Sequence, residues 1–230
     1  MTRDAIASRI RFNLNDAGVN FYSADDINNS IQDGYDEVVA IGQPIEKVAT
    51  LSWVSSLVYY NFRNLISDFI RPIAIFDNNS NRWLEHKSLQ FLQAQRQDFE
   101  LIAGPPFWYY VLDYNYTAVS PRYEAASGTF DVLYKASADT LSGGTVPSLP
   151  DSLTSVLESY GTADLLEQAE EYEKATKYWY GNPKINQFGY FDYLEKIKKE
   201  VRSRESPDRI HVLREQYLQA NTRDASLVIR

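Results

Sequence analysis

The residue types that most often act in catalysis or bind metal ions are scarce in this chain. It contains two histidines, His86 and His211, and no cysteine. Neither histidine has the second histidine or flanking carboxylates of a helical metal site, and thiolate ligands and nucleophiles are absent. No G-x-S-x-G elbow, G-x-G-x-x-G fingerprint or Gly-rich phosphate loop occurs. We therefore expect no catalytic, cofactor or metal site and predict that the protein is not an enzyme.

Carboxylates are the one plentiful group with catalytic potential, because glycoside hydrolysis needs a pair of them. Asp25 and Asp26 fall where the first turn of a helix is expected, and there they complement the helix dipole. The four glutamates between residues 167 and 173 have the spacing of a solvent-facing helix surface. A hydrolase acting on peptidoglycan is therefore a third hypothesis, which needs carboxylates that meet only in three dimensions.

The charge distribution restricts the partners. The net charge of −8 repels a phosphate backbone, so we expect no general nucleic-acid binding, although an acidic protein can surround DNA without gripping it. Residues 151–173 carry acidic side chains and no Lys or Arg, whereas residues 196–214 are mainly basic. These faces are either solvated or paired between neighbouring subunits of a ring. The candidate inter-subunit charge contacts are Glu167, Glu170, Glu171, Lys198, Lys199 and Arg202.

Aromatic residues are abundant, with 17 Tyr, 11 Phe and 4 Trp. Such rings fill cores and half-buried sheets, and they are also enriched where proteins meet. An alternative function is therefore open, in which an aromatic-rich binding module recognises a glycan or a host surface. Its candidate platform comprises Trp53, Trp83, Phe107, Trp108 and Tyr109.

The sequence predicts neither export nor membrane insertion. The N-terminal residues contain no apolar h-region, so we expect no signal peptide. No run approaches the roughly 20 apolar residues that span a bilayer, so we expect no membrane partner. The absence of cysteine is consistent with a reducing cytoplasm.

Helical periodicity dominates the N-terminal third. The spacing from Ile6 to Leu14 predicts one helix. Ser23 and Asp26 predict the start of a second helix, close to a capping box, which runs to Gly42.

Residues 46–149 have the texture of strands and turns. Segments 70–76 and 82–84 flank a turn cluster and predict a hairpin. Residues 107–119 predict one long aromatic strand, and the alternation in residues 129–134 predicts another half-buried strand.

Helical spacing returns after a linker rich in Gly, Ser and Pro at residues 141–150. Residues 153–179 predict one long helix, with Gly161 at a close helix crossing, and residues 190–201 predict a last helix. Because the N-terminal helices are too short to bury their apolar faces alone, we expect them to pack on the C-terminal helices.

The predicted fold class is α+β, mainly α: an antiparallel helical bundle from the N- and C-terminal helices, a β-rich insertion and an extended C-terminal tail. The predicted domains are residues 1–45 and 150–205 for the bundle, 46–149 for the insertion and 206–230 for the tail. No internal repeat or low-complexity tract interrupts this organisation.

Several motifs follow one another along residues 1–205. They are Ile6-x-x-x-Ile10-Arg-x-x-Leu-Asn-Asp16, Phe21-Tyr-Ser-Ala-Asp-Asp-Ile27-Asn-x-x-Ile31, Gly104-Pro-Pro-x-x-Tyr109, and Val146-Pro-Ser-Leu-Pro150 followed by Tyr160 and Ala163-Asp-Leu-Leu166. In this order they resemble the motifs of the head-to-tail adaptor (connector) proteins of tailed bacteriophages, of the short-tailed, podovirus-like type. Residues 54–103 match that family poorly.

The resemblance implies a structural virion protein at the head–tail junction, assembled in the host cytoplasm. Its copies would form a ring, a dodecamer, that lines the DNA passage without sequence-specific binding. Its partners would be the portal protein and a tail protein, a nozzle or stopper. The family's C-terminal segment docks on the portal, and in the matching tail the implied docking residues are Arg209, Ile210, Leu213, Arg214, Tyr217 and Leu218.

Overall fold

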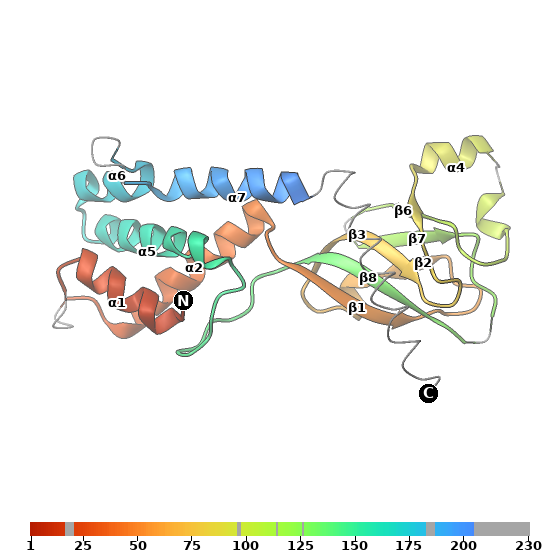
Figure 1. Ribbon diagram of the computed structural model, residues 1–230, viewed down its shortest axis with the longest axis horizontal. Coiled ribbons are helices and arrows are strands. Elements are labelled where there is room, and N and C mark those ends of the chain that lie inside the picture. The colour runs from red at the N-terminus through yellow and green to blue at the C-terminus, as the bar shows by residue number, and fades with distance from the viewer. Residues whose placement is uncertain (17–20, 96–97, 114, 126, 183–186, 205–230) are drawn as a thin grey trace, which may run out of the picture. The chain divides into compact units, whose positions relative to one another are not determined.

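The chain divides into two compact units. The helical unit comprises Met1–Ile45 and the chain from Ala138 onward, and the sheet unit comprises Glu46–Ser137. The chain therefore leaves the helical unit once, builds the sheet unit and returns. The computed structural model (Figure 1) describes residues 1–204 except 17–20, 96–97, 114, 126 and 183–186.

Five α-helices form the described part of the helical unit. They are α1 (Arg3–Asn13), α2 (Ala24–Gly42), α5 (Ser155–Gln168), α6 (Tyr172–Tyr180) and α7 (Tyr190–Arg204), with a 3-10 turn at Asp151–Leu153. The predicted start of α2 is confirmed, because Ser23 and Asp26 form a complete capping box. The Asp26 N–H donates to Oγ of Ser23 at 3.1 Å, and the Ser23 N–H donates to Oδ2 of Asp26 at 3.0 Å.

Glycine allows two close approaches between these helices. A methyl group added at Gly34 of α2 would lie 2.6 Å from Cδ1 of Tyr160 in α5. One added at Gly161 of α5 would lie 2.6 Å from Cδ1 of Ile10 in α1. The close helix crossing predicted at Gly161 is therefore present, since only a hydrogen atom fits between the helices there.

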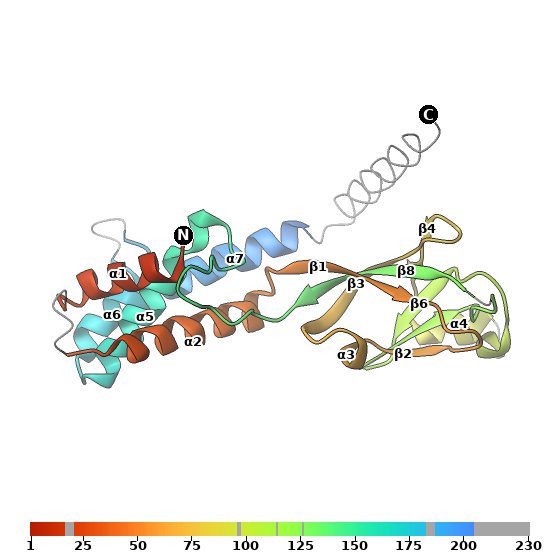
Figure 2. The same cartoon turned by 90° about the horizontal axis from the view of Figure 1, so that it is seen from below.

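The sheet unit contains two four-stranded sheets within its described residues. The first has the order β1-β8-β3-β4, with β1 (Glu46–Ser52), β8 (Thr129–Ala136), β3 (Phe69–Asp77) and β4 (Arg82–Trp83). The second has the order β2-β7-β6-β5, with β2 (Tyr59–Asn61), β7 (Tyr116–Ser120), β6 (Trp108–Val111) and β5 (Glu85–His86). Two short helices, α3 (Phe62–Leu65) and α4 (Leu89–Gln95), and a 3-10 turn at Phe99–Leu101 connect strands. Figures 1 and 2 show β1, β8 and β3 side by side.

The central strand β8 is buried on both faces. On one face, Phe130 is fully buried and stacks on Trp53 with ring centroids 4.0 Å apart. On the other face, Lys135 is 0% exposed, and its Nζ lies 2.8 Å from Oε1 of Glu46. These two residues are direct partners in the β1–β8 ladder, so the pairing of the strands places the countercharge beside the buried ammonium.

The predicted fold class, a mainly α helical bundle with a β-rich insertion, is wrong. The described residues form seven α-helices and two four-stranded sheets, which is an α+β fold. Periodicity underestimates the sheets because β2, β4 and β5 span only two or three residues, too few for an alternation to be recognised.

Two predicted elements are each divided. The single helix predicted for residues 153–179 is two helices, because Glu170, between α5 and α6, has a left-handed φ of 60°. The single strand predicted for residues 107–119 is the antiparallel hairpin of β6 and β7. Oδ1 of Asp113 holds its turn by accepting hydrogen bonds from the N–H groups of the second and third residues after it, at 2.7 and 2.8 Å. The predicted hairpin of β3 and β4 is confirmed.

Candidate protein-interaction surface

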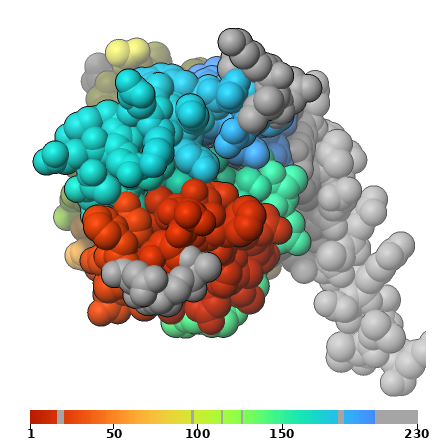
Figure 3. Space-filling view, turned by 90° about the vertical axis from the view of Figure 1, so that its left-hand side faces the viewer, coloured from red at the N-terminus to blue at the C-terminus, as the bar shows by residue number. Residues whose placement is uncertain are grey.

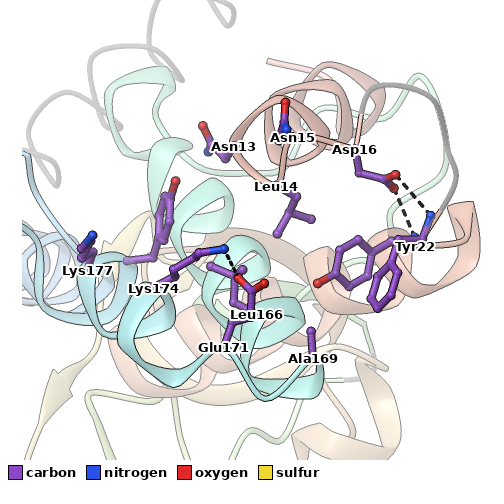
Figure 4. Close-up of a pocket in the computed structure, with 12 residues that line it drawn as sticks. Asn13, Leu14, Asn15, Asp16, Tyr22, Leu166, Ala169, Glu171, Lys174 and Lys177 are labelled. Atoms are coloured by element: carbon purple, nitrogen blue, oxygen red, sulfur yellow. Dashed lines mark hydrogen bonds and ion pairs between the residues drawn. The ribbon is translucent and has the colours of Figure 1, made fainter.

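A hollow of about 480 Å³ lies between the end of α1 and the start of α6 (Figure 4). The chain that follows α1 forms one wall, and the end of α5 with α6 forms the other. Figure 3 shows the face of the helical unit on which the red α1–α2 segment meets the teal α5–α6 segment. The polar lining residues and the tyrosines include Asn13, Asn15, Tyr22, Lys174, Lys177 and Tyr178.

Asp16 fixes the wall that follows α1. Its carboxylate is buried and accepts hydrogen bonds from Nη1 of Arg11 at 3.2 Å and from the N–H groups of Phe21 and Tyr22 at 3.2 and 3.1 Å. Figure 4 shows the two bonds that reach back to Asp16. The Tyr22 hydroxyl then donates to the Leu165 carbonyl oxygen of α5 at 3.1 Å. The buried carboxylate of Asp16 thus anchors this wall, because it satisfies donors of Arg11, Phe21 and Tyr22.

The opposite wall follows from the break between α5 and α6. The Glu171 N–H donates to a carbonyl oxygen of α5 at 2.8 Å, and the Glu171 carboxylate pairs with Lys174 at 2.5 Å. Lys177 lies one turn further along α6. Burial raises the pKa of the Tyr22 phenol, and the charges of Glu171 and Asp16 raise it further. The hydroxyl therefore stays protonated and remains a hydrogen-bond donor beside the hollow.

A second hollow of about 270 Å³ adjoins the first and shares Asn13 and Tyr178 with it. Phe188 lines it, and Nζ of Lys196 lies 3.3 Å from the centroid of that ring. Glu158 also lines it, and burial raises the pKa of this carboxyl against the lowering effect of an arginine 2.8 Å away. The two adjoining hollows, whose walls carry charged and aromatic side chains, are together called the depression.

Large aromatic rings are exposed around this depression. Phe21, which lines the first hollow, is 74% exposed, and Phe188, which lines the second, is 47% exposed. Phe12, next in sequence to the lining residue Asn13, is 82% exposed. Exposed apolar groups clustered beside hollows are typical of protein–protein contact surfaces, in which aromatic anchors contribute most of the binding energy. We call this region, with the two hollows and these three rings, the aromatic surface of the helical unit.

The acidic residues predicted to form inter-subunit contacts have partners nearby in the same chain. Glu167 accepts a hydrogen bond from Nε1 of Trp179 at 2.6 Å, and Glu171 is paired with Lys174. Glu170 is exposed at the break between α5 and α6. Of the three acidic side chains only Glu171 forms an ion pair with another described residue, whereas Glu167 is held by a hydrogen bond and Glu170 is exposed.

The basic residues of the same prediction lie together on α7. Lys198 pairs with Glu195 at 3.0 Å, whereas Lys199 and Arg202 are exposed. The hydrogen bond from Lys198 lowers the pKa of Glu195, and the charges of Arg202 and Lys199 lower it further. Among the described residues no ion pair joins this basic group to the acidic group within one copy.

The other candidate residues do not form one exposed platform. Of the proposed aromatic platform, Trp53 and Tyr109 are only 5% and 3% exposed, so they do not present a face to a ligand. Phe107 is exposed, but the guanidinium of Arg82 lies 3.6 Å from its centroid. His86 is exposed in β5. The predicted portal-docking residues and the second histidine lie outside the described residues: Arg209, Ile210, Leu213, Arg214, Tyr217, Leu218 and His211.

No local sequence pattern predicts the two hollows, because their walls come from segments more than 100 residues apart. One signal for the aromatic surface is present in the sequence. Phe12 lies off the stripe formed by Ile6 and Ile10, and a large ring on the polar side of an amphipathic helix indicates exposure. The sequence thus points to one exposed ring next to Asn13, but not to the depression that Asn13 lines.

Within residues 1–204 and outside their undescribed gaps, no three metal-ligating side chains gather as they would around an ion. No helix in that part of the chain has the length and apolar character to cross a membrane. Neither the protein families nor the curated proteins with which the sequence was compared match it.

Proposed function

We propose that the protein is a structural subunit of a ring that joins the portal to the tail of a short-tailed bacteriophage and lines the DNA passage. The order of the motifs from Ile6 to Leu166 suggests this class of protein. The aromatic surface of the helical unit is the single observation that carries the proposal, because a ring subunit must offer neighbours an apolar contact. Its role is structural rather than catalytic, and its place is the head–tail junction of the virion.

The exposed rings set the strength of one contact. Fully burying a Phe side chain contributes about 1.5–3 kcal/mol, so Phe12 and Phe21 together contribute about 3–6 kcal/mol. Association costs about 4–15 kcal/mol in lost freedom. The two phenyl side chains therefore contribute to a contact, but their burial alone does not offset the free-energy cost of associating two copies. In a closed ring every copy is held on two sides, which raises the effective concentration of each contact.

Charges on the helices supply direction to the same contact. Glu170 at the break between α5 and α6, and Lys199 and Arg202 on α7, are exposed and of opposite sign. Exposed pairs contribute only about 0–1 kcal/mol each, so they select the neighbour's orientation rather than add much affinity. A head-to-tail arrangement, a dodecamer as in the connector family, would bring these groups together between copies. The remaining negative charge suits a DNA conduit that must not bind its cargo.

Negative-stain microscopy of the full chain, alone and mixed with the portal ring encoded by the same genome, tests the proposal. We expect an added ring of density on the portal, which is lost when residues 207–230 are deleted. Absence of any complex at micromolar concentration would refute the connector function.

Surface variants connect the assembly to the aromatic surface. Phe12→Ser and Phe21→Ser should each reduce the yield of ring assemblies on the portal. Both variants should fold, because the two phenyl side chains are exposed. Leu101→Ser is the matched control, since Leu101 is 69% exposed but lies in the sheet unit. Rings that survive both Phe substitutions would show that the contact lies elsewhere.

A further inference from the structure

β1 forms a free edge of its sheet. Among the described residues it pairs with β8 on one side and with no strand on the other. The pairing with β8 runs without a register shift over all seven residues of β1, so the free edge is straight and regular. Val48 in its middle is 52% exposed. Figure 1 shows β1 at the border of the sheet.

The ladder determines which backbone groups point outward. The N–H of Trp53, just beyond β1, donates to a carbonyl oxygen beside β8 at 2.9 Å. Hydrogen-bonded and non-bonded positions alternate in an antiparallel pair. Val48, Thr50 and Ser52 are therefore the positions whose N–H and C=O groups point away from β8. Such groups need water or a partner strand.

The other edges of the sheet unit are protected. β3 contains Pro72, which has no N–H to offer a further strand. Its carbonyl oxygens at Ile73 and Ile75 accept hydrogen bonds from the Tyr109 hydroxyl at 3.0 Å and from the Leu84 N–H at 2.8 Å. β2, β4 and β5 have only two or three residues. β1, in contrast, has no proline and no bulge and pairs with no second described strand, and natural proteins rarely leave so long an edge unprotected.

We propose that the free edge of β1 receives an added strand, Ser226-Leu-Val-Ile-Arg230, from the C-terminus of a neighbouring copy. The assignment to a neighbour rests on the proposed self-assembly. Leu, Val and Ile without proline or glycine favour strand formation. α7 ends at Arg204, and the 26 residues that follow extend up to about 85 Å. This reach exceeds the roughly 30 Å diameter of a small domain, so the segment can pass from one copy to the next.

Charge selects the direction of the added strand. In an antiparallel register with Arg230 opposite Glu46, the guanidinium meets a carboxylate, whereas a parallel strand would carry it to the uncharged end of β1. The same register places Val228 beside Val48 on the exposed face. Cross-strand pairs of β-branched residues stabilise a sheet, so charge and apolar contact agree on one arrangement.

Disulfide cross-linking tests the contact, because the chain contains no cysteine and an introduced pair is unambiguous. A full-length Val48→Cys chain mixed with a full-length Val228→Cys chain under mild oxidation should give a disulfide between the two different cysteine peptides, which neither chain gives alone and which reduction reverses. Leu227→Cys is the matched control, since its side chain would point to the opposite face of the added strand. We expect the control to cross-link about tenfold more slowly or not at all, because disulfides tolerate little misalignment. Equal rates for the two positions would overturn the proposal.

Hydrogen exchange provides a second readout without cysteine. Deletion of residues 226–230 should speed the exchange of the Val48, Thr50 and Ser52 amides in the assembled protein, and unchanged exchange would count against the added strand. Microscopy separates this contact from the ring itself. Ring assemblies that form without the cross-link would support self-assembly and refute strand addition. A cross-link that forms without ring assemblies would support strand addition and refute the ring.

Discussion

Replacing Glu46 by Gln should destabilise the sheet unit more than replacing its ion-pair partner Lys135 by Met. Both substitutions break the same pair, in which Nζ and Oε1 lie 2.8 Å apart. They differ in the charge that remains. Glu46→Gln leaves the ammonium of Lys135, whose side chain is 0% exposed, and Lys135→Met leaves the carboxylate of Glu46, whose side chain is 25% exposed. The two variants therefore separate the cost of a buried charge from the loss of an ion pair.

The magnitudes follow from burial. At 2.8 Å and an effective dielectric constant of about 20, the gross attraction is about 6 kcal/mol, most of which desolvation offsets. Glu46→Gln keeps a carbonyl acceptor but leaves the Lys135 ammonium without this countercharge, so we expect a loss of about 3 kcal/mol, the low end for breaking a buried pair. Lys135→Met fills the same space and leaves a carboxylate that water reaches, so we expect a loss of at most about 1 kcal/mol.

Urea titration followed by tryptophan fluorescence measures both values. Three of the four tryptophans lie in the sheet unit, and a Trp179→Phe background removes the signal of the helical unit. The slope of each transition is compared with that of the parent, so that a change in midpoint reports stability alone. If Lys135→Met costs as much as Glu46→Gln, or if Glu46→Gln costs less than about 1 kcal/mol, the buried ammonium is not the source of the effect.

Two further changes probe the helix packing and the pH dependence. Gly34→Ala should lower the thermal midpoint measured by circular dichroism, because overpacking against Tyr160 costs about 1–3 kcal/mol and the higher helix propensity of alanine returns only about 1 kcal/mol. Asn29→Ala, at an exposed position of the same helix, is the control. Equal midpoints for the two variants would contradict the clash with Tyr160. Burial alone would raise the pKa of Asp68, but hydrogen bonds from Lys47 and a tyrosine lower it overall. Since the folded-state pKa lies below the ordinary 3.8, the carboxylate stabilises the fold above that pH and loses this effect as the pH falls through the folded-state value. Asp68→Asn should thus lower the urea midpoint at pH 7 but not near pH 2, and a loss of equal size at both would exclude the charge as its cause.

Several elements were predictable from the sequence because their signals are local. The capping box of Ser23 and Asp26 specifies the start of α2 through atoms three residues apart. The turn cluster between β3 and β4 specifies a hairpin in the same way. Gly161 predicted a close crossing, since glycine in a helix interior is unfavourable unless something must approach it. Of the candidate site, the charged residues on α5, α6 and α7 were predictable as exposed helix faces.

The tertiary structure alone decided the features that depend on partners distant in sequence. The division of one expected helix at Glu170 and of one expected strand at Asp113 follows from hydrogen bonds that no apolar periodicity records. The depression between α1 and α6 exists because residues 13–16, 21 and 22 meet residues 166–178, and the burial of Lys135 follows from its pairing with Glu46 across the sheet. A sequence pattern reports the environment that a residue shares with its near neighbours in the chain. The long-range contacts that create a hollow, an ion pair or a free strand edge are selected by the packing of the whole unit.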